Sequence, residues 1–288
     1  MNSTNKPNSK ILYNPFIRIV IGIGICVTVF IIVQAAITWL LGFTRVGDEI
    51  KTLVTSVIAT IAVLTTYIKL YSKYENRSIA ELSTKHLVKN IIIGIALGAL
   101  LQCLTIYVIY INHSFSVIAT NSFLYILPGL GISLSAAILE EILFRGIIFR
   151  ITEEKLGSYI ALAISASIFG AAHLANPNST LLAALGIAVQ AGLLLGAAYI
   201  YTRNLWFPIA LHFAWDFTQS GIFGATMSGG TIGKSLLTTR IDGPTLISGG
   251  AFGPEGSIQA TLFCLAAAIV LMIINHKQHK LIKPYWAK

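Results

Sequence analysis

Long apolar runs separated by short polar segments make up most of this chain. Eight of these runs could cross a bilayer core of roughly 30 Å, which takes about 20 helical residues. They cover about 17–41, 52–71, 90–111, 122–150, 158–174, 180–202, 204–220 and 258–275. The fifth and seventh runs are short, and the fourth is long because it contains charged residues. The pattern predicts an all-α, polytopic membrane protein with a bundle of about eight transmembrane helices.

The composition agrees with a membrane location. The chain is 55% hydrophobic and only 11% charged, whereas soluble domains carry about 25% charged residues. No hydrophilic block is long enough for a soluble domain. We therefore expect a single transmembrane domain over 17–276, with a core of polar motifs at 120–220. A cytoplasmic tail at 1–16, Asn/Ser/Lys-rich and typical of disorder over 1–10, precedes this domain, and a basic cytoplasmic tail at 277–288 follows it.

The distribution of basic residues predicts an orientation. In an eight-span arrangement, 16 of the 20 Lys and Arg residues fall on the side of the N-terminus. The four on the other side are Arg45, Lys51, Lys234 and Arg240. Because cytoplasmic loops are enriched in Lys and Arg, both termini are expected in the cytoplasm. The net charge of +9 then indicates contact with anionic lipids, and no nucleic-acid-binding module is present.

A Gly- and Ser-rich segment at 221–257 contains the run Gly253-Pro254-Glu255-Gly256. Long loops without structure of their own tend to be functional or disordered. Two interpretations remain open here: a flexible extracytoplasmic connector, or a lid that shapes the substrate site.

Small residues within the predicted spans favour packing over chemistry. The pairs Gly94/Gly98 and Gly192/Gly196 have the small-xxx-small spacing that allows helices to pack closely. The three cysteines lie inside separate predicted spans: Cys26, Cys103 and Cys264. We expect them to act as small core residues, without disulfides or a cysteine metal site.

Two adjacent carboxylates, Glu140 and Glu141, interrupt the fourth apolar run. A charge at bilayer depth costs at least about 2.5–3.5 kcal/mol, so such residues indicate function. Neighbouring helix positions point about 100° apart, and Arg145 lies four residues after Glu141, in the favourable acid-first order. An ion pair of Glu141 with Arg145 would leave Glu140 free to act as a general base. The alternative is a structural pairing of Glu140 with a distant Arg or His.

Two further spans contain polar residues that are costly in a membrane. The fifth carries His173, and the seventh carries His212 and Asp216 on one helix face. A lone His on an apolar helix is more often a satisfied core residue than a ligand. Two histidines, an aspartate and two glutamates in neighbouring spans are more typical of one shared cavity.

These residues together resemble the CAAX-protease and bacteriocin-processing family of intramembrane endopeptidases, which includes the eukaryotic prenyl-protein protease. Its motifs, in order, are Glu-Glu-x-x-x-Arg, Phe-x-x-x-His and His-x-x-x-Asn/Asp. The matching residues are Glu140, Glu141 and Arg145, then Phe169 and His173, then His212 and Asp216, with Phe144 beside the first motif. The motifs occupy about a third of the chain, and the family's eight-helix fold extends the resemblance over most of it.

The resemblance implies hydrolysis of peptide bonds in membrane-associated proteins or peptides. Glu140 and His173 would activate water, and His212, oriented by Asp216, would stabilise the oxyanion. Glu141, Arg145, Phe144 and Phe169 would support them. Where the third motif ends in Asn, its amide can donate a hydrogen bond, whereas an ionised Asp216 can only accept one.

Asp216 therefore leaves a metal-dependent mechanism open. Glu140, His173 and His212 form a two-His, one-carboxylate set compatible with Zn. Glu140 could not be both ligand and base without help from Glu141, and the His-Glu-x-x-His motif is absent. We favour a glutamate-dependent mechanism without a cofactor, with a zinc enzyme as the alternative.

Other functional classes remain open as well. One is a non-catalytic family member that acts as a bacteriocin-immunity or scaffold protein. Another is a proton-coupled transporter that uses the buried Glu and His residues as a relay. The family branch places the protein in a bacterial plasma membrane. The sequence does not predict the substrate, the cleavage site or the oligomeric state.

Overall fold

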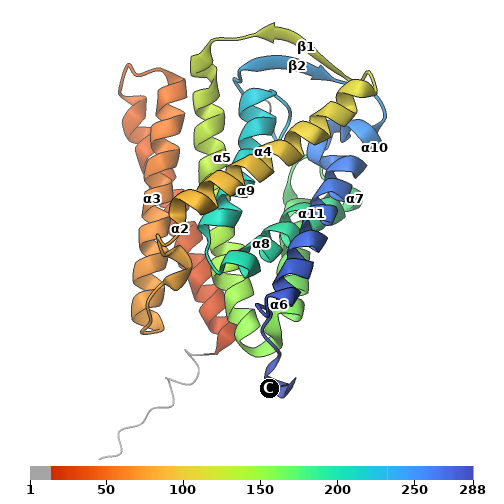
Figure 1. Ribbon diagram of the computed structural model, residues 1–288. Helices are drawn as coiled ribbons and strands as arrows, with labels where there is room; N and C mark the ends of the chain where they lie inside the picture. Colours follow the sequence, from red (N-terminus) through yellow and green to blue (C-terminus); the bar gives the residue numbers. More distant parts are fainter. Residues whose placement is uncertain (1–13, 232, 288) are drawn as a thin grey trace, which may run out of the picture.

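The computed structural model describes residues 14–231 and 233–287, and these form a bundle of helices capped by a small sheet (Figure 1). The helices are α2 (Pro15–Gly42), α3 (Asp48–Tyr74), α4 (Leu87–Ile111), α5 (Ile126–Glu141), α6 (Arg150–Ala172), α7 (Leu181–Ile187), α8 (Leu194–Thr202), α9 (Trp206–Asp216), the short α10 (Thr245–Ser248) and α11 (Ile258–Lys277). Three π-helical segments continue α5, α7 and α9: η3 (Ile142–Phe149), η5 (Ala188–Leu193) and η6 (Phe217–Ile222). The predicted all-α polytopic membrane fold is confirmed.

Six helical runs in the described ranges are long and apolar enough to cross a membrane. They are Pro15–Gly42, Asp48–Tyr74, Leu87–Ile111, Phe123–Ala175, Leu181–Thr202 and Ile258–Lys277. The run Phe123–Ala175 joins the fourth and fifth predicted spans, but its backbone leaves helical geometry at Gly157, where φ is +74°. The seventh predicted span corresponds to the shorter α9 and η6. The count of eight spans and the cytoplasmic side of both termini stay predictions, and the predicted tail at 1–10 lies outside the described residues.

The Gly-rich segment at 221–257 has secondary structure that its composition did not indicate. Its strand β2 (Leu237–Ile241) pairs antiparallel with β1 (Phe115–Thr120), with Phe115 opposite Ile241. This sheet lies across one end of the bundle, at the top of Figure 1. The segment then forms α10 and two short 3-10 turns, Gly250–Phe252 and Pro254–Gly256, before α11 begins. These turns bring the segment back to the helices.

Close packing at glycines fixes α4 against α9, as the small-xxx-small spacing predicted. A Cβ at Gly98 would lie 2.2 Å from the Leu211 carbonyl oxygen, and one at Gly94 would lie 2.7 Å from the Ala210 Cβ. Gly192 packs equally closely on Ala166, where an added Cβ would lie 2.7 Å from the Cα. Because Leu211 directly precedes His212, the α4–α9 contact also fixes the position of that histidine.

The cysteines differ in burial. Cys26 and Cys264 are buried, as expected for small core residues, and all three thiols are free. The prediction is wrong for Cys103, which is exposed. Its helix, α4, packs on α9 through the Gly94/Gly98 side, and Cys103 lies outside that contact.

Candidate active site

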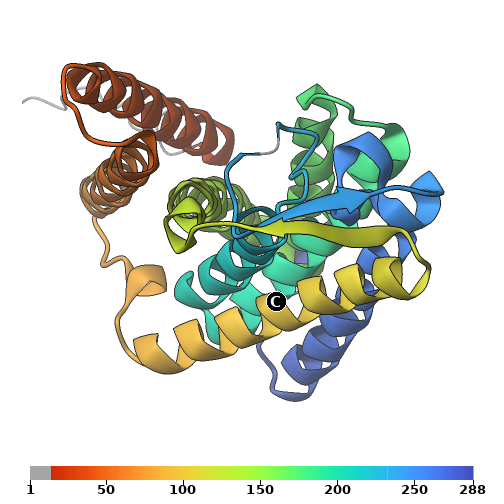
Figure 2. The same cartoon turned by 90° about the horizontal axis from the view of Figure 1, so that it is seen from above.

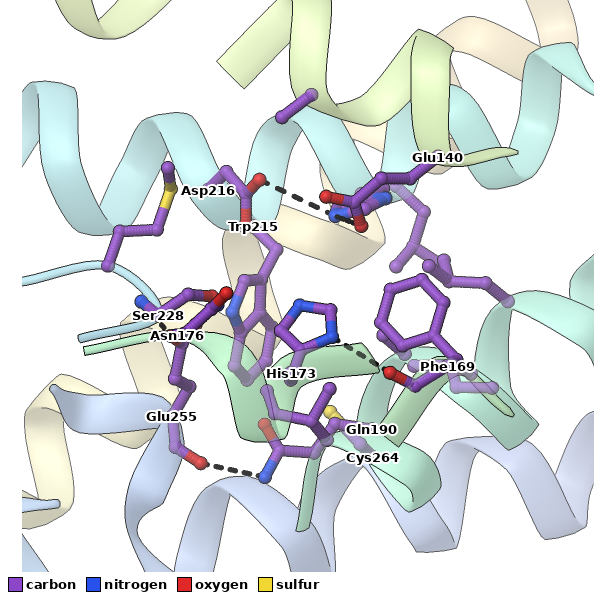
Figure 3. A pocket seen from close by; sticks show the side chains of 18 residues that line it. Glu140, Phe169, His173, Asn176, Gln190, Trp215, Asp216, Ser228, Glu255 and Cys264 are labelled. Atoms are coloured by element: carbon purple, nitrogen blue, oxygen red, sulfur yellow. Dashed lines mark hydrogen bonds and ion pairs between the residues drawn. The ribbon is translucent and has the colours of Figure 1, made fainter. Parts of the chain in front are cut away.

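The structure brings Glu140, His173, His212 and Asp216 to one cavity of about 120 Å³ (Figure 3). Glu140 comes from the end of α5, His173 from the end of α6, and the other two from α9. Three predicted spans therefore supply the four residues that the sequence singled out, and all four line this cavity.

The two adjacent glutamates have different surroundings. The predicted ion pair of Glu141 with Arg145 is present, with 2.7 Å between Oε1 and Nη1, and both side chains are fully buried. Arg145 Nη2 also donates to the carbonyl oxygens of Ala191 at 2.5 Å and Gly192 at 3.1 Å. By contrast, the Glu140 side chain is 29% exposed and faces the cavity.

The π-helical segments lie where these groups meet. A π-helical turn is wider than an α-helical one and occurs frequently at functional sites. Segment η3 begins directly after Glu141, and η6 begins directly after Asp216. Segment η5 contains Ala191 and Gly192, whose carbonyl oxygens bind Arg145. The sequence analysis, which assumed α-helical spacing throughout, did not predict these segments.

His212 is surrounded by three carboxylates. Its Nδ1 lies 3.2 Å from Glu141 Oε1, and its Nε2 lies 3.4 Å from Asp216 Oδ2 and 3.9 Å from Glu140 Oε2. A carboxylate oxygen can only accept, and an imidazole donates from both nitrogens only when it is protonated. With these carboxylates ionised, the geometry fits an imidazolium at His212.

Glu140 is the carboxylate of the motif with a free oxygen at the cavity. Its Oε2 is buried and accepts no hydrogen bond within the described residues. The contact with His212 at 3.9 Å is an ion pair at long range and not a hydrogen bond. This oxygen can accept a proton or a hydrogen bond from a molecule in the cavity.

His173 is held in a single tautomer when neutral. Its Nδ1 lies 2.9 Å from the Phe169 carbonyl oxygen, which can only accept, so Nδ1 carries the hydrogen and Nε2 carries a lone pair. The ring stacks on Phe169 at 4.7 Å between centroids. Phe169 in turn contacts Phe144 at 4.5 Å and lies under the Arg145 guanidinium at 5.0 Å. The supporting residues thus connect the ion pair to His173.

Comparison with known protein families gives a match over the same segment of the chain that contains the site residues. Residues 122–218, about a third of the chain, match the family model described as type II CAAX prenyl endopeptidase Rce1-like. The chain carries an Rce1-like segment. It begins just ahead of α5 and ends two residues past Asp216, so it contains every motif residue named above. No curated protein and no solved structure matches the chain.

The family match confirms the resemblance seen in the sequence. Together with the apolar helices, it supports an integral membrane protein that acts as a CAAX-type intramembrane protease. The Rce1-like segment ends before the Gly-rich segment begins, so the match does not cover the residues that close the cavity from that side.

Glu255 is a site residue that the sequence analysis did not single out. It lies in the turn Pro254–Gly256, is buried, and lines the cavity beside the Rce1-like residues (Figure 3). Its carboxylate accepts the backbone N–H of Ser228, and its own carbonyl oxygen accepts from Gln190 Nε2 at 2.8 Å. Burial, reinforced by the nearby Asp216 carboxylate, raises the pKa of Glu255 to about 7. A Glu in an otherwise Gly-rich, uncharged run was the signal available in the sequence.

The residues of the alternative zinc site do not form a metal-binding cluster. No group of three or more His, Cys, Asp or Glu side chains in the described ranges is arranged to hold a metal ion. Glu140 and His212 are close together, but Asp216 and Glu141 occupy the ring nitrogens of His212. In this arrangement Glu141 and Asp216 face the two ring nitrogens of His212, so Zn binding by Glu140, His173 and His212 would require His212 to lose its Nε2 proton and turn from Asp216.

A second, wider hollow also reaches Glu140. It has a volume of about 710 Å³ and lies between α2, α3 and α5. Its polar lining consists of Gln34, Thr38, Asp48, Lys51, Thr52, Thr55, Ser56, Ser135 and Glu140. Glu140 and Ala136 line both spaces, so the Glu140 carboxylate lies at the boundary between the smaller cavity and the wider hollow.

Proposed function

We propose that the protein is an intramembrane endopeptidase in which Glu140 is the general base. The observation that carries the proposal is the difference in the placement of the paired glutamates. Glu141 is fully buried and bound through Oε1 to Arg145 and His212, whereas Glu140 lines the cavity, is 29% exposed and accepts no hydrogen bond at Oε2 in the described structure. A general base must reach the proton that it removes, and a water molecule in this cavity would lie within that reach. The substrate would be a membrane-associated protein or peptide, and the proposed location is a bacterial plasma membrane.

His173 supports the water from the other side. Because its Nδ1–H is committed to the Phe169 carbonyl, its Nε2 lone pair can accept a hydrogen bond from the same water. Glu140 then takes a proton as the water oxygen attacks the scissile carbonyl carbon. The protonated Glu140 then gives that proton to the leaving amine. Glu140 therefore acts first as the general base and then as the general acid.

His212 supplies positive charge for the oxyanion. Its Nε2–H lies 3.4 Å from Asp216 and 3.9 Å from Glu140, longer than an ordinary charge-assisted hydrogen bond. This donor is therefore only loosely held and can turn to a carbonyl oxygen that gains negative charge. An ionised Asp216 can only accept, so it keeps His212 protonated and does not itself bind the oxyanion. Preorganised donors of this kind are among the largest contributions to acyl-transfer catalysis.

The substrate reaches Glu140 through the hollow between α2, α3 and α5. The smaller cavity of about 120 Å³ holds only a few water molecules, at about 30 Å³ each. The hollow of about 710 Å³ has the volume of an ordinary ligand pocket and room for several residues of an extended peptide. Its Ser, Thr and Gln side chains can bond the peptide backbone.

Cleavage of membrane peptides by purified, reconstituted protein in ¹⁸O-labelled water tests this proposal. The expected result is one ¹⁸O atom in the new C-terminus, and a loss of at least about 100-fold in kcat for His173→Ala. His276→Ala is the matched control, because His276 lies exposed at the end of α11, and it should cleave normally. Products without ¹⁸O, or full activity in His173→Ala, would contradict the mechanism. Stoichiometric zinc that is lost in His173→Ala would replace it by the metal-dependent alternative.

A further inference from the structure

A second site lies at the other end of α4, away from the proposed active site. A hollow of about 480 Å³ opens between the start of α4, the turn from α8 to α9 and the chain after α11. Its volume falls in the range of ligand pockets, about 300–1,000 Å³. The view from above shows α4 crossing the face of the bundle on this side (Figure 2). None of the proposed catalytic residues lines it.

The lining of this hollow is strongly basic. Five cationic or titratable basic side chains line it: Lys85, His86, Lys89, Arg203 and Lys280. No Asp or Glu is among the described residues of the lining. Within the described ranges Lys85 and Lys89 make no ion pair, and only Arg203 is neutralised, by Glu153 at 2.5 Å. The hollow therefore carries an uncompensated positive charge.

Backbone carbonyl groups hold two of the basic side chains, Arg203 and Lys280, close together. Lys280 Nζ donates to the backbone carbonyl oxygen of Tyr201 at 2.5 Å. It also lies 4.1 Å from the centre of the Tyr201 ring. Arg203 donates to the carbonyl oxygen of Lys280. Burial, together with the adjacent Arg203 charge, lowers the pKa of Lys280. An anion in the hollow would relieve this repulsion.

A polar side chain at the start of α4 also opens into the hollow. Asn90 is only 8% exposed, lines the hollow, and its amide makes no hydrogen bond within the described residues. Asn90 stands one turn before Gly94, where α4 contacts α9, so its amide is fixed in place and can donate to a ligand.

The edge of the hollow is apolar. Ile93 lies in the lining, and Val88 and Ile92 are exposed on the adjacent surface of α4. Exposed aliphatic residues beside a basic hollow fit a ligand that carries both a phosphate and an acyl chain. Basic pockets between transmembrane helices on the cytoplasmic side are typical headgroup sites, and this end carries the basic residues that predict the cytoplasmic side.

We propose that this hollow binds the phosphate of an anionic phospholipid, with Lys85, Lys89 and the Asn90 amide as donors. The shared chemistry is a phosphate group, and its two sources are a lipid headgroup and a free phosphate ion. The aliphatic edge favours the lipid. This site is independent of the proposed protease mechanism and does not require it to be correct.

Native mass spectrometry and thermal melts of the detergent-purified full chain, titrated with phosphatidylglycerol, phosphatidylcholine or inorganic phosphate, test the site. Phosphatidylglycerol should be retained and should raise the Tm, with little effect of the other two. The double variant Lys85→Gln/Lys89→Gln should bind it at least about tenfold more weakly. Lys69→Gln/Lys73→Gln is the matched control, because these exposed lysines have the same spacing on α3, and it should bind normally.

Asn90→Leu separates ligand binding from a structural role. It removes a side-chain amide that makes no hydrogen bond in the described structure, so the ligand-free Tm should change little, while affinity for phosphatidylglycerol should fall. Equal weakening in both lysine double variants would reduce the site to general surface charge and overturn the proposal. If inorganic phosphate displaces the lipid at comparable concentration, the bound phosphate group need not come from a lipid, and the lipid proposal is overturned. If Asn90→Leu binds phosphatidylglycerol normally, Asn90 is not part of the site.

Discussion

Glu141 and Arg145 form a fully buried ion pair, with 2.7 Å between Oε1 and Nη1, directly beside the free carboxylate of Glu140. The same Glu141 oxygen lies 3.2 Å from His212 Nδ1. One carboxylate therefore fixes both the arginine of its own helix and the histidine of α9. Glu140 is therefore not needed to hold either of these two side chains in place.

Removal of one partner of this pair should destabilise the protein more than removal of both. Glu141→Gln or Arg145→Met leaves a buried charge without its partner, which costs about 3–5 kcal/mol. The double variant Glu141→Gln/Arg145→Met leaves neither charge and should recover part of that loss. Thermal melts of the three variants in one detergent measure the effect. Equal melting temperatures for single and double variants would contradict the role of this pair.

The contact between α4 and α9 should control the position of His212. Gly98→Ala would place a Cβ 2.2 Å from the Leu211 carbonyl oxygen, so α9 must shift. Overpacking of this kind costs about 1–3 kcal/mol, and peptide cleavage should fall together with the Tm. Gly24→Ala is the control, because an added Cβ there meets nothing within 4 Å. An active, stable Gly98→Ala protein would show that this contact does not position His212.

Much of the site could be predicted because it depends on local spacing. The i to i+4 relationships of Glu141 with Arg145 and of His212 with Asp216 follow from helical geometry, and both contacts are present. The apolar runs predicted the helices because a bilayer demands about 20 apolar residues for each crossing.

The remaining features depend on contacts that are distant in the sequence. Strand β1 pairs with β2, more than 100 residues later in the chain, and neither strand has an alternating pattern long enough to be recognised. Glu255 reaches the cavity through a turn held by Ser228 and Gln190. The π-helical segments arise where tertiary contacts, such as Arg145 on the Ala191 carbonyl, compete with regular helix hydrogen bonds. None of these contacts has a local pattern.

Glu255 should make the stability of the protein depend on pH. Its pKa in the folded protein, about 7, lies above the ordinary value of 4.5. The stability associated with its neutral form is therefore fully present below about pH 4.5 and is lost as the pH rises through 7. Glu255→Gln keeps an acceptor for the Ser228 N–H and cannot ionise. Its Tm should match the wild type at pH 4.5 and exceed it at pH 8. A constant difference across this range would contradict the prediction.

The hollow between α2, α3 and α5 should limit substrate access. Thr38 lines this hollow, so Thr38→Trp narrows it without touching the proposed catalytic residues. We expect KM to rise at least about fivefold with a smaller change in kcat, since only substrate binding is impeded. Ala35→Trp on the same helix places the same bulky side chain at an exposed position outside the lining. A shared effect of both variants would point to membrane insertion instead of access.

The role of Glu140 as general base is the central claim, and Glu140→Gln tests it most directly. The substitution preserves size and removes the basic oxygen, so cleavage of a reconstituted membrane peptide should fall by about 100- to 10,000-fold. The Tm should change little, because Glu140 makes no hydrogen bond through its buried oxygen in the described structure. Cleavage by Glu140→Gln at the wild-type rate would contradict the account.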